Sequence, residues 1–158
     1  LSGAGGVLAA ATVTRLAFGK TDVIQMLNGC IGGLVAITAE PLMPSPIAAI
    51  LIGGVGGVIV VFGTKLLFSL KIDDVVGAIP AHLFAGIWGT LAVPITNPDT
   101  NFGAQLLGVI SINVFVFIVS LIVWGIMKNT IGIRLSKDGE LKGTDVTETG
   151  VIAYAIRD

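Results

Sequence analysis

The chain contains few charged or chemically reactive side chains. Only 12% of its 158 residues are Asp, Glu, Lys or Arg, and it has one cysteine, one histidine and one tyrosine. The single cysteine, Cys30, excludes a disulfide bond within the chain. With a net charge of −1 and no run of like charges in its apolar part, the chain gives no indication of a nucleic-acid partner.

The shortage of reactive side chains also argues against an enzyme. The lone histidine, His82, has no nucleophile, no second titratable group and no set of metal ligands within its apolar segment. We therefore expect no catalytic residue, no metal and no other cofactor.

Apolar residues, in contrast, are abundant. The chain is 54% hydrophobic, with 22 glycines and a mean hydropathy of +0.97. Since roughly 20 apolar helical residues cross a hydrocarbon core of about 30 Å, long apolar runs predict membrane spans. Runs bounded by charge, proline or glycine occur at 1–18, 23–39, 47–70, 75–95 and 102–127. The sequence therefore predicts an all-α transmembrane bundle of five spans within residues 1–130, and a solvent-exposed tail at 131–158.

The lysines and arginines lie on one side of this predicted topology. They flank the first and third connections or lie at or beyond the end of the fifth span. The second and fourth connections, "AEPLMPSP" and "TNPDTNFG", contain only the acids Glu40 and Asp99. Because Lys and Arg accumulate in cytoplasmic loops, the pattern predicts an outer N-terminus and a cytoplasmic tail. We expect a multi-pass protein of the plasma (cell inner) membrane.

Glycines recur at helical spacing in two of the spans. Gly29 and Gly33 are four residues apart, as are Gly53 and Gly57 in "GGVGGV". Helices in lipid associate through close van der Waals contact, which small residues permit. The pattern predicts closely packed helices. It does not predict a phosphate-binding loop, because "GGVGGV" lacks the required Lys and Ser/Thr.

The candidate functional residue is His82, in the segment "GAIPAHLFAGIWGT" (77–90). An ionisable side chain within a membrane span is expensive, and it generally faces the bundle interior or a water-filled path. Eight helical residues after Asp74 advance roughly 12 Å, which predicts a position between the cytoplasmic edge and the bilayer midplane. The alternative is a structural histidine that only ties two helices together by a hydrogen bond.

A histidine in a narrow apolar passage favours a neutral polar permeant. Removing the water shell of a bare ion costs on the order of tens of kcal/mol by Born estimates. No ring of carbonyls or acids is evident in this span to replace that shell. An imidazole can donate to or accept from ammonia, and it can take up a proton near neutral pH.

Residues around the histidine are expected to shape its helix. Pro80 cannot donate to the carbonyl of Val76, so the helix should bend or loosen there, either at a permeation site or as an ordinary proline kink. Asp73 and Asp74 precede the span, where carboxylates cap free backbone N–H groups. Asn28, in the second span, is expected to form a hydrogen bond between helices.

Several stretches together resemble the ammonium transporter family (Amt/MEP/Rh). The pair Asp73–Asp74, His82 and "GIWGT" are spaced as in the family helix that carries the second of two pore histidines. "LNGCIGGLVAITAEP" is similar to another family helix, and "TIGIRLSKDGELKGTDVTETGVIAY" is similar to the family's cytoplasmic tail. The resemblance covers the whole chain and implies the C-terminal five of eleven spans. The first histidine and the outer binding residues would then belong to sequence outside this chain.

The resemblance implies an ammonium transporter that serves nitrogen uptake. Ammonium would lose a proton at an outer vestibule, and ammonia and the proton would cross a hydrophobic pore lined by His82 and by the other pore histidine of the family, which lies outside this chain. It also implies a homotrimer in the lipid bilayer, and a tail that docks PII-type regulatory proteins. The tail residues that match the family are Gly132, Arg134, Gly143, Asp145, Gly150 and Tyr154.

The chain departs from the family pattern at a few positions. Gly77 stands where an acid is common, and Pro80 and Leu83 stand where glycines flank the histidine. In the tail, Thr149 and Val151 replace the usual histidine and glutamate.

Two other functions are compatible with the sequence. One is an ammonium sensor with the same fold that signals through its tail, which an appended signalling domain would distinguish. The other is a generic ion-coupled transporter with a structural histidine. Acidic residues inside the fourth span would favour the ion-coupled transporter, and none lies between Val75 and Ile95.

Overall fold

The computed structural model describes residues 1–153, and every regular element in this range is helical. The elements are α1 (Ser2–Phe18), α2 (Val23–Ile37), α3 (Pro46–Ser69), the π-helical segment η1 (Ile79–Phe84), α4 (Ala85–Thr96), α5 (Phe102–Thr130), α6 (Lys137–Lys142) and a second π-helical segment η2 (Asp145–Thr149). The all-α prediction is therefore confirmed for the described residues. The chain forms two compact units, Leu1–Ile112 and a second that begins at Asn113.

Short polar residues and a proline fix the beginnings of α2 and α3. The Asp22 carboxylate accepts a hydrogen bond from the Gln25 N–H at 3.1 Å, and the Ser45 hydroxyl accepts one from the Ala48 N–H at 3.3 Å. Both bonds satisfy backbone donors that have no partner inside the helix. Pro46 occupies the start of α3, where a missing N–H costs nothing.

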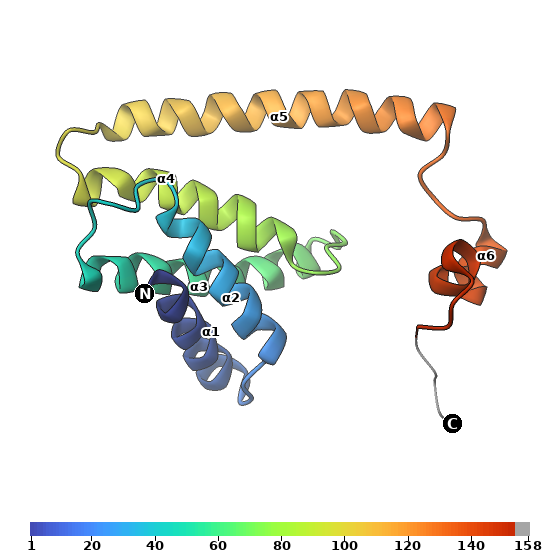
Figure 1. The fold of residues 1–158 in the computed structure, drawn as a ribbon, viewed down its shortest axis with the longest axis horizontal. Helices are drawn as coiled ribbons and strands as arrows, with labels where there is room; N and C mark the ends of the chain where they lie inside the picture. Colours follow the sequence, from blue (N-terminus) through green and yellow to red (C-terminus); the bar gives the residue numbers. More distant parts are fainter. Residues whose placement is uncertain (154–158) are drawn as a thin grey trace. The chain divides into compact units, whose positions relative to one another are not determined.

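Helices α1, α2 and α3 pack against one another through their glycines (Figure 1). The backbone of Gly6 on α1 lies against the backbones of Gly29 on α2 and Gly57 on α3. Between α2 and α3, a Cβ placed on Gly56 would lie only 2.7 Å from the carbonyl oxygen of Gly32. Only glycine, which has no Cβ, allows the helix backbones to approach this closely. The close approach increases van der Waals contact between the helices, which matters because no hydrophobic effect drives helix association in lipid.

Helix α4 packs on α2 and α3. Gly89 lies against the backbone of Ala36, and the indole N–H of Trp88 donates to the Ile52 carbonyl at 3.0 Å. A buried cluster of Ala36, Ile52 and Ala92 surrounds this contact. These interactions hold the helix that continues from η1.

The connections between helices alternate between the two ends of the first unit. At one end, the amide Nδ2 of Asn97 donates to Oε2 of Glu40 at 3.0 Å, which links the fourth connection to the second. At the other end, the Lys65 ammonium lies 3.8 Å from the centroid of the Phe18 ring, which links the end of α3 to the end of α1. Successive helices therefore run in opposite directions.

Within residues 1–153, three helical stretches are long and apolar enough to cross a membrane: Pro46–Ser69, Ile79–Thr96 and Phe102–Thr130. Helix α2, with 15 residues, is a shorter apolar helix. Helix α5 has a mean hydropathy of 2.8 over its most apolar window, and none of its residues is buried. A helix that is apolar on all sides suits contact with lipid or with other apolar helices. The fold is that of a polytopic transmembrane helix bundle.

Replacing Lys71 with glycine should stabilise the first unit. Lys71 follows α3 with a φ of +57°, in the left-handed region that costs a residue with a Cβ roughly 1 kcal/mol. We expect Lys71→Gly to raise the free energy of unfolding by about 0.5–1 kcal/mol, measured as a higher thermal midpoint in detergent. Lys71→Ala removes the same charge but keeps the strain, so equal midpoints for the two variants would contradict this explanation.

Candidate functional site

The predicted pore residue, His82, lies in the π-helical segment η1 that leads into α4. Pro80 and Ala81 are buried on the side of η1 that packs on α2 and α3, whereas His82 and Leu83 are exposed. Within residues 1–153 the imidazole has no hydrogen-bond partner. The described part of the chain therefore offers no support for a histidine that ties two of these helices together.

The backbone around the histidine departs from a regular α-helix. The expected loss of a helical bond to Val76 does not arise, because helix begins only at Ala78 and Pro80 lies in its first turn, where a missing N–H costs no helical bond. Residues from Ile79 to Phe84 nevertheless adopt the wider π-helical winding, and the Ala85 N–H reaches back to the Pro80 carbonyl. Single π-helical turns of this kind often occur at functional sites.

The helical segment begins later than the sequence predicts. The prediction assumed that helix follows Asp74 directly, but Gly77 has a φ of +75° and helix begins only at Ala78. The two oxygens of the Asp74 carboxylate accept hydrogen bonds from the N–H groups of Ala78 and Ile79, at 2.9 and 2.8 Å. His82 is therefore about one turn into the helical segment, and the depth calculated from eight helical residues is wrong.

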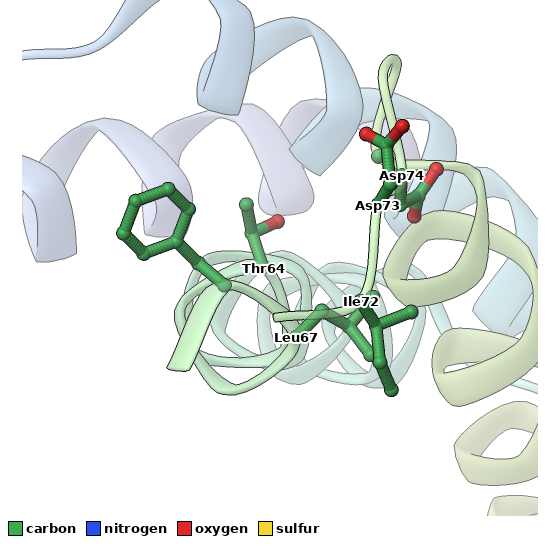
Figure 2. A pocket seen from close by; sticks show the side chains of 7 residues that line it. Thr64, Leu67, Ile72, Asp73 and Asp74 are labelled. Atoms are coloured by element: carbon green, nitrogen blue, oxygen red, sulfur yellow. The ribbon is translucent and has the colours of Figure 1, made fainter. Parts of the chain in front are cut away.

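The two acids line a small cavity beside the end of α3 (Figure 2). Its volume is about 130 Å³, and its lining residues are Thr64, Leu67, Phe68, Ile72, Asp73, Asp74 and Gly77. Asp74 also caps the helical segment, whereas Asp73 contributes a carboxylate to the cavity wall. His82 is not among the lining residues, so this cavity does not bring the acids and the histidine together.

Asn28 reaches the same segment from α2. Its amide Nδ2 donates to the carbonyl of Val76 at 2.8 Å. Val76 lies before the first helical residue, Ala78, so its carbonyl has no donor within the helix. The sequence predicted an interhelical bond from Asn28 but not its partner.

The three glycines predicted to matter in the tail occupy backbone conformations that other residues rarely adopt. They are Gly132, Gly143 and Gly150, with φ values of +80°, +99° and +69°. The structure brings one of them next to Asp145, since a Cβ on Gly143 would lie 2.6 Å from Oδ1 of that acid. Oδ2 of Asp145 accepts a hydrogen bond from the Ala153 N–H at 2.8 Å. These residues shape the tail around η2.

Arg134, another predicted tail residue, forms a two-pronged ion pair with Glu140 of α6. The guanidinium Nε and Nη2 donate to the two carboxylate oxygens. The sequence did not predict this pairing, because the two residues are six positions apart and only the folding of α6 brings them together. The last predicted tail residue, Tyr154, lies outside the described residues.

The ion pair predicts a pH dependence of the tail. The hydrogen bonds and positive charge of Arg134 lower the pKa of the Glu140 carboxyl and raise the pKa of the guanidinium. The carboxyl pKa is lower in the folded tail than in the unfolded one. The stability that the ionised Glu140 gives to the folded tail is therefore fully present above the unfolded pKa and is lost as pH falls through the folded pKa. Arg134 stays charged throughout that range.

We therefore expect protection of the α6 amides from hydrogen exchange to weaken at acidic pH, beyond the change in intrinsic exchange rate. The effect should be modest, since both side chains are exposed. Glu140→Gln should show weak protection at every pH. An identical pH profile in wild type and variant would show that the pair does not stabilise α6.

The sequence of this chain is similar to those of known ammonium transporters. The sequence profile of the Ammonium Transporter Family matches residues 1–154. The chain is 37% identical to ammonium transporter Amt2 of Archaeoglobus fulgidus, over 98% of this chain and 37% of that protein. It is 34% identical to ammonium transporter Amt1 of Haloferax mediterranei, over 94% of this chain and 30% of that protein.

A solved structure entitled "Sensor Amt Protein" has the same fold. It superposes with a TM-score of 0.86 at 27% identity and covers 93% of this chain and 39% of its own. This chain therefore spans less than two fifths of each of these relatives.

Proposed function

Because this chain belongs to the ammonium transporter family, we propose that it forms one wall of an ammonium conduction path lined by His82. The observation that carries the proposal is the exposure of His82 on the side of η1 opposite the packed residues Pro80 and Ala81. An ionisable group on an open face of a membrane helix is expensive in lipid and suits the wall of a passage. The curated relatives are transporters, which agrees with the absence of an enzymatic motif from the sequence.

The proposed mechanism separates the proton from the nitrogen. Ammonium gives up a proton before it enters the apolar passage, since a bare cation there would lose its water without replacement. The imidazole of His82 then donates to or accepts from ammonia, and it takes up and releases the proton. Ammonia and one proton would thus cross together, and potassium, which has no proton to give up, would be excluded.

The opposite wall of the path is proposed to come from the rest of the full-length protein. The relatives are more than twice as long as the matched region, which leaves ample chain to supply it. A second histidine in that wall would complete the proton relay. We further propose a homotrimer with one path per subunit, as the family resemblance implies.

The tail is proposed to face the cytoplasm of a plasma-membrane protein. The basic residues that flank the first and third connections support this orientation, because those connections lie at one end of the first unit. The tail glycines with positive φ and the Arg134–Glu140 pair give the tail a defined backbone course. A PII-type regulatory protein is the proposed partner that binds this tail.

An ammonium sensor is the second candidate function. The likeness to a structure entitled "Sensor Amt Protein", at a TM-score of 0.86, favours it specifically. A sensor would keep the ligand-binding fold and signal through the tail, without net passage of nitrogen.

Uptake of isotope-labelled ammonium separates the two functions. The full-length protein would be reconstituted into liposomes at mildly acidic pH, where little free ammonia diffuses through lipid, with an inside-negative potential. A transporter accumulates label faster than protein-free liposomes do. Saturable ammonium binding without accumulation would favour the sensor instead.

A further inference from the structure

Asn28 is the polar side chain that the conduction mechanism leaves unexplained. It lies in α2 with only 9% of its surface exposed, and its amide donates to the Val76 carbonyl at 2.8 Å. Burying an amide is costly unless it is hydrogen-bonded. The bond therefore fixes the Asn28 side chain against Val76, which lies 48 residues later in the sequence.

The Val76 carbonyl depends on this donor. Val76 lies two residues before Ala78, where the helical segment begins, so its carbonyl is outside the helical hydrogen-bond ladder. The first carbonyl that accepts a helical bond is that of Gly77, which takes the N–H of Ala81 at 3.2 Å. Asn28 thus supplies from another helix the donor that the backbone of this segment cannot supply.

The space for the Asn28 amide exists because residue 77 is glycine. A Cβ on Gly77 would lie 2.5 Å from Nδ2 of Asn28, and the φ of +75° suits glycine. On the other side of Gly77, the Asp74 carboxylate holds the N–H groups of Ala78 and Ile79. The backbone is therefore fixed on both sides of the turn that leads into η1.

We propose that Asn28 is a positioning residue for His82: by holding the Val76 carbonyl, it sets the start of η1 and thereby directs the imidazole to the open face. His82 follows the held carbonyl by six residues, within the π-helical winding of η1. A shift at Val76 would move His82 directly, since no hydrogen bond to the imidazole restrains it within the described residues. The consequence for transport rests on the function proposed above, but the positioning itself does not.

The test uses Asn28→Leu, which keeps a similar volume but removes the donor, in the full-length protein. The first readout is the imidazole signal of His82 in magnetic resonance spectra of protein with isotope-labelled histidine, assigned by its loss in His82→Ala. We expect Asn28→Leu to shift or split this signal, because the start of η1 is no longer held. Thr64→Val is the matched control: it removes another polar group near the same end of the bundle, and the signal should stay in place. An unmoved signal in folded Asn28→Leu would overturn the proposal.

Transport provides the second readout, per molecule of folded protein. Asn28→Leu should lower the ammonium-evoked current about tenfold through misplacement of the imidazole. If the His82 signal moves as expected but the wild type passes no current, Asn28 positions His82 and the transport function is wrong. If Asn28→Leu fails to fold, Gly77→Ala displaces the amide from the other side and should shift the same signal. A folded Gly77→Ala protein with an unmoved signal would contradict the proposal.

Discussion

Replacing His82 with alanine is expected to lower the ammonium-evoked current of the full-length protein about a hundredfold, within the range for loss of a proton-transferring side chain. Without the imidazole, ammonia loses a hydrogen-bonding partner in the apolar path and the proton loses its carrier. The measurement is the transient current of proteoliposomes after an ammonium pulse, normalised to the amount of folded protein. Removal of the side chain also widens the path, so potassium should begin to pass.

The control for this prediction is Val116→Ala, which shortens an exposed side chain on α5. Its current should equal that of the wild type, since the change leaves the imidazole and every residue of η1 in place. If His82→Ala conducts ammonium as well as this control does, the histidine is not part of the path.

Replacing Gly57 with alanine should prevent stable packing of the first unit. A Cβ on Gly57 would approach the backbone of Gly6 closer than 3.0 Å, a distance that real Cβ atoms essentially never show. Backbone cannot move aside as a flexible side chain can, so α1 and α3 must separate. We expect a loss of about 2–3 kcal/mol in the free energy of unfolding, at the upper end for overpacking.

Gly54→Ala is the matched control on the same helix. Its added Cβ would meet nothing nearer than the Gly5 carbonyl oxygen at 3.9 Å. Since alanine favours helix over glycine by about 1 kcal/mol, this variant should be neutral or slightly more stable. Thermal unfolding in detergent compares the two, and equal midpoints would show that α1 and α3 do not meet as closely as described.

The helical nature of the chain could be predicted because apolar runs of membrane-spanning length leave few alternatives. The glycine pairs likewise predicted close helix contacts, although the sequence could not show which glycines meet. Gly6 contacts both α2 and α3, and nothing in the spacing within α1 distinguishes it from its neighbours. Contacts between distant segments depend on how helices cross, which local sequence does not determine.

The start of the histidine-bearing helix could not be predicted in the same way. Val75 and Val76 are apolar and continue the hydrophobic run, so the pattern placed them in the span. Gly77 interrupts the helix because its φ is +75° and because Asp74 caps the residues after it. Asn28 from another helix also donates to the Val76 carbonyl, and this contact is visible only in three dimensions.

Among the candidate site residues, His82 stood out because it is the only histidine and lies in an apolar segment. Its exposure could not be predicted from periodicity, since the surrounding helix is apolar on every side. The partner of Arg134 was equally inaccessible, because Glu140 becomes its neighbour only when α6 forms.

We propose that the full-length protein conducts ammonia together with a proton and excludes bare cations. The most direct measurement is the transient current of wild-type proteoliposomes after an ammonium pulse, compared with a potassium pulse of equal size. We predict an inward positive current with ammonium and none with potassium. Equal currents for both ions, or ammonium binding without any current, would contradict it.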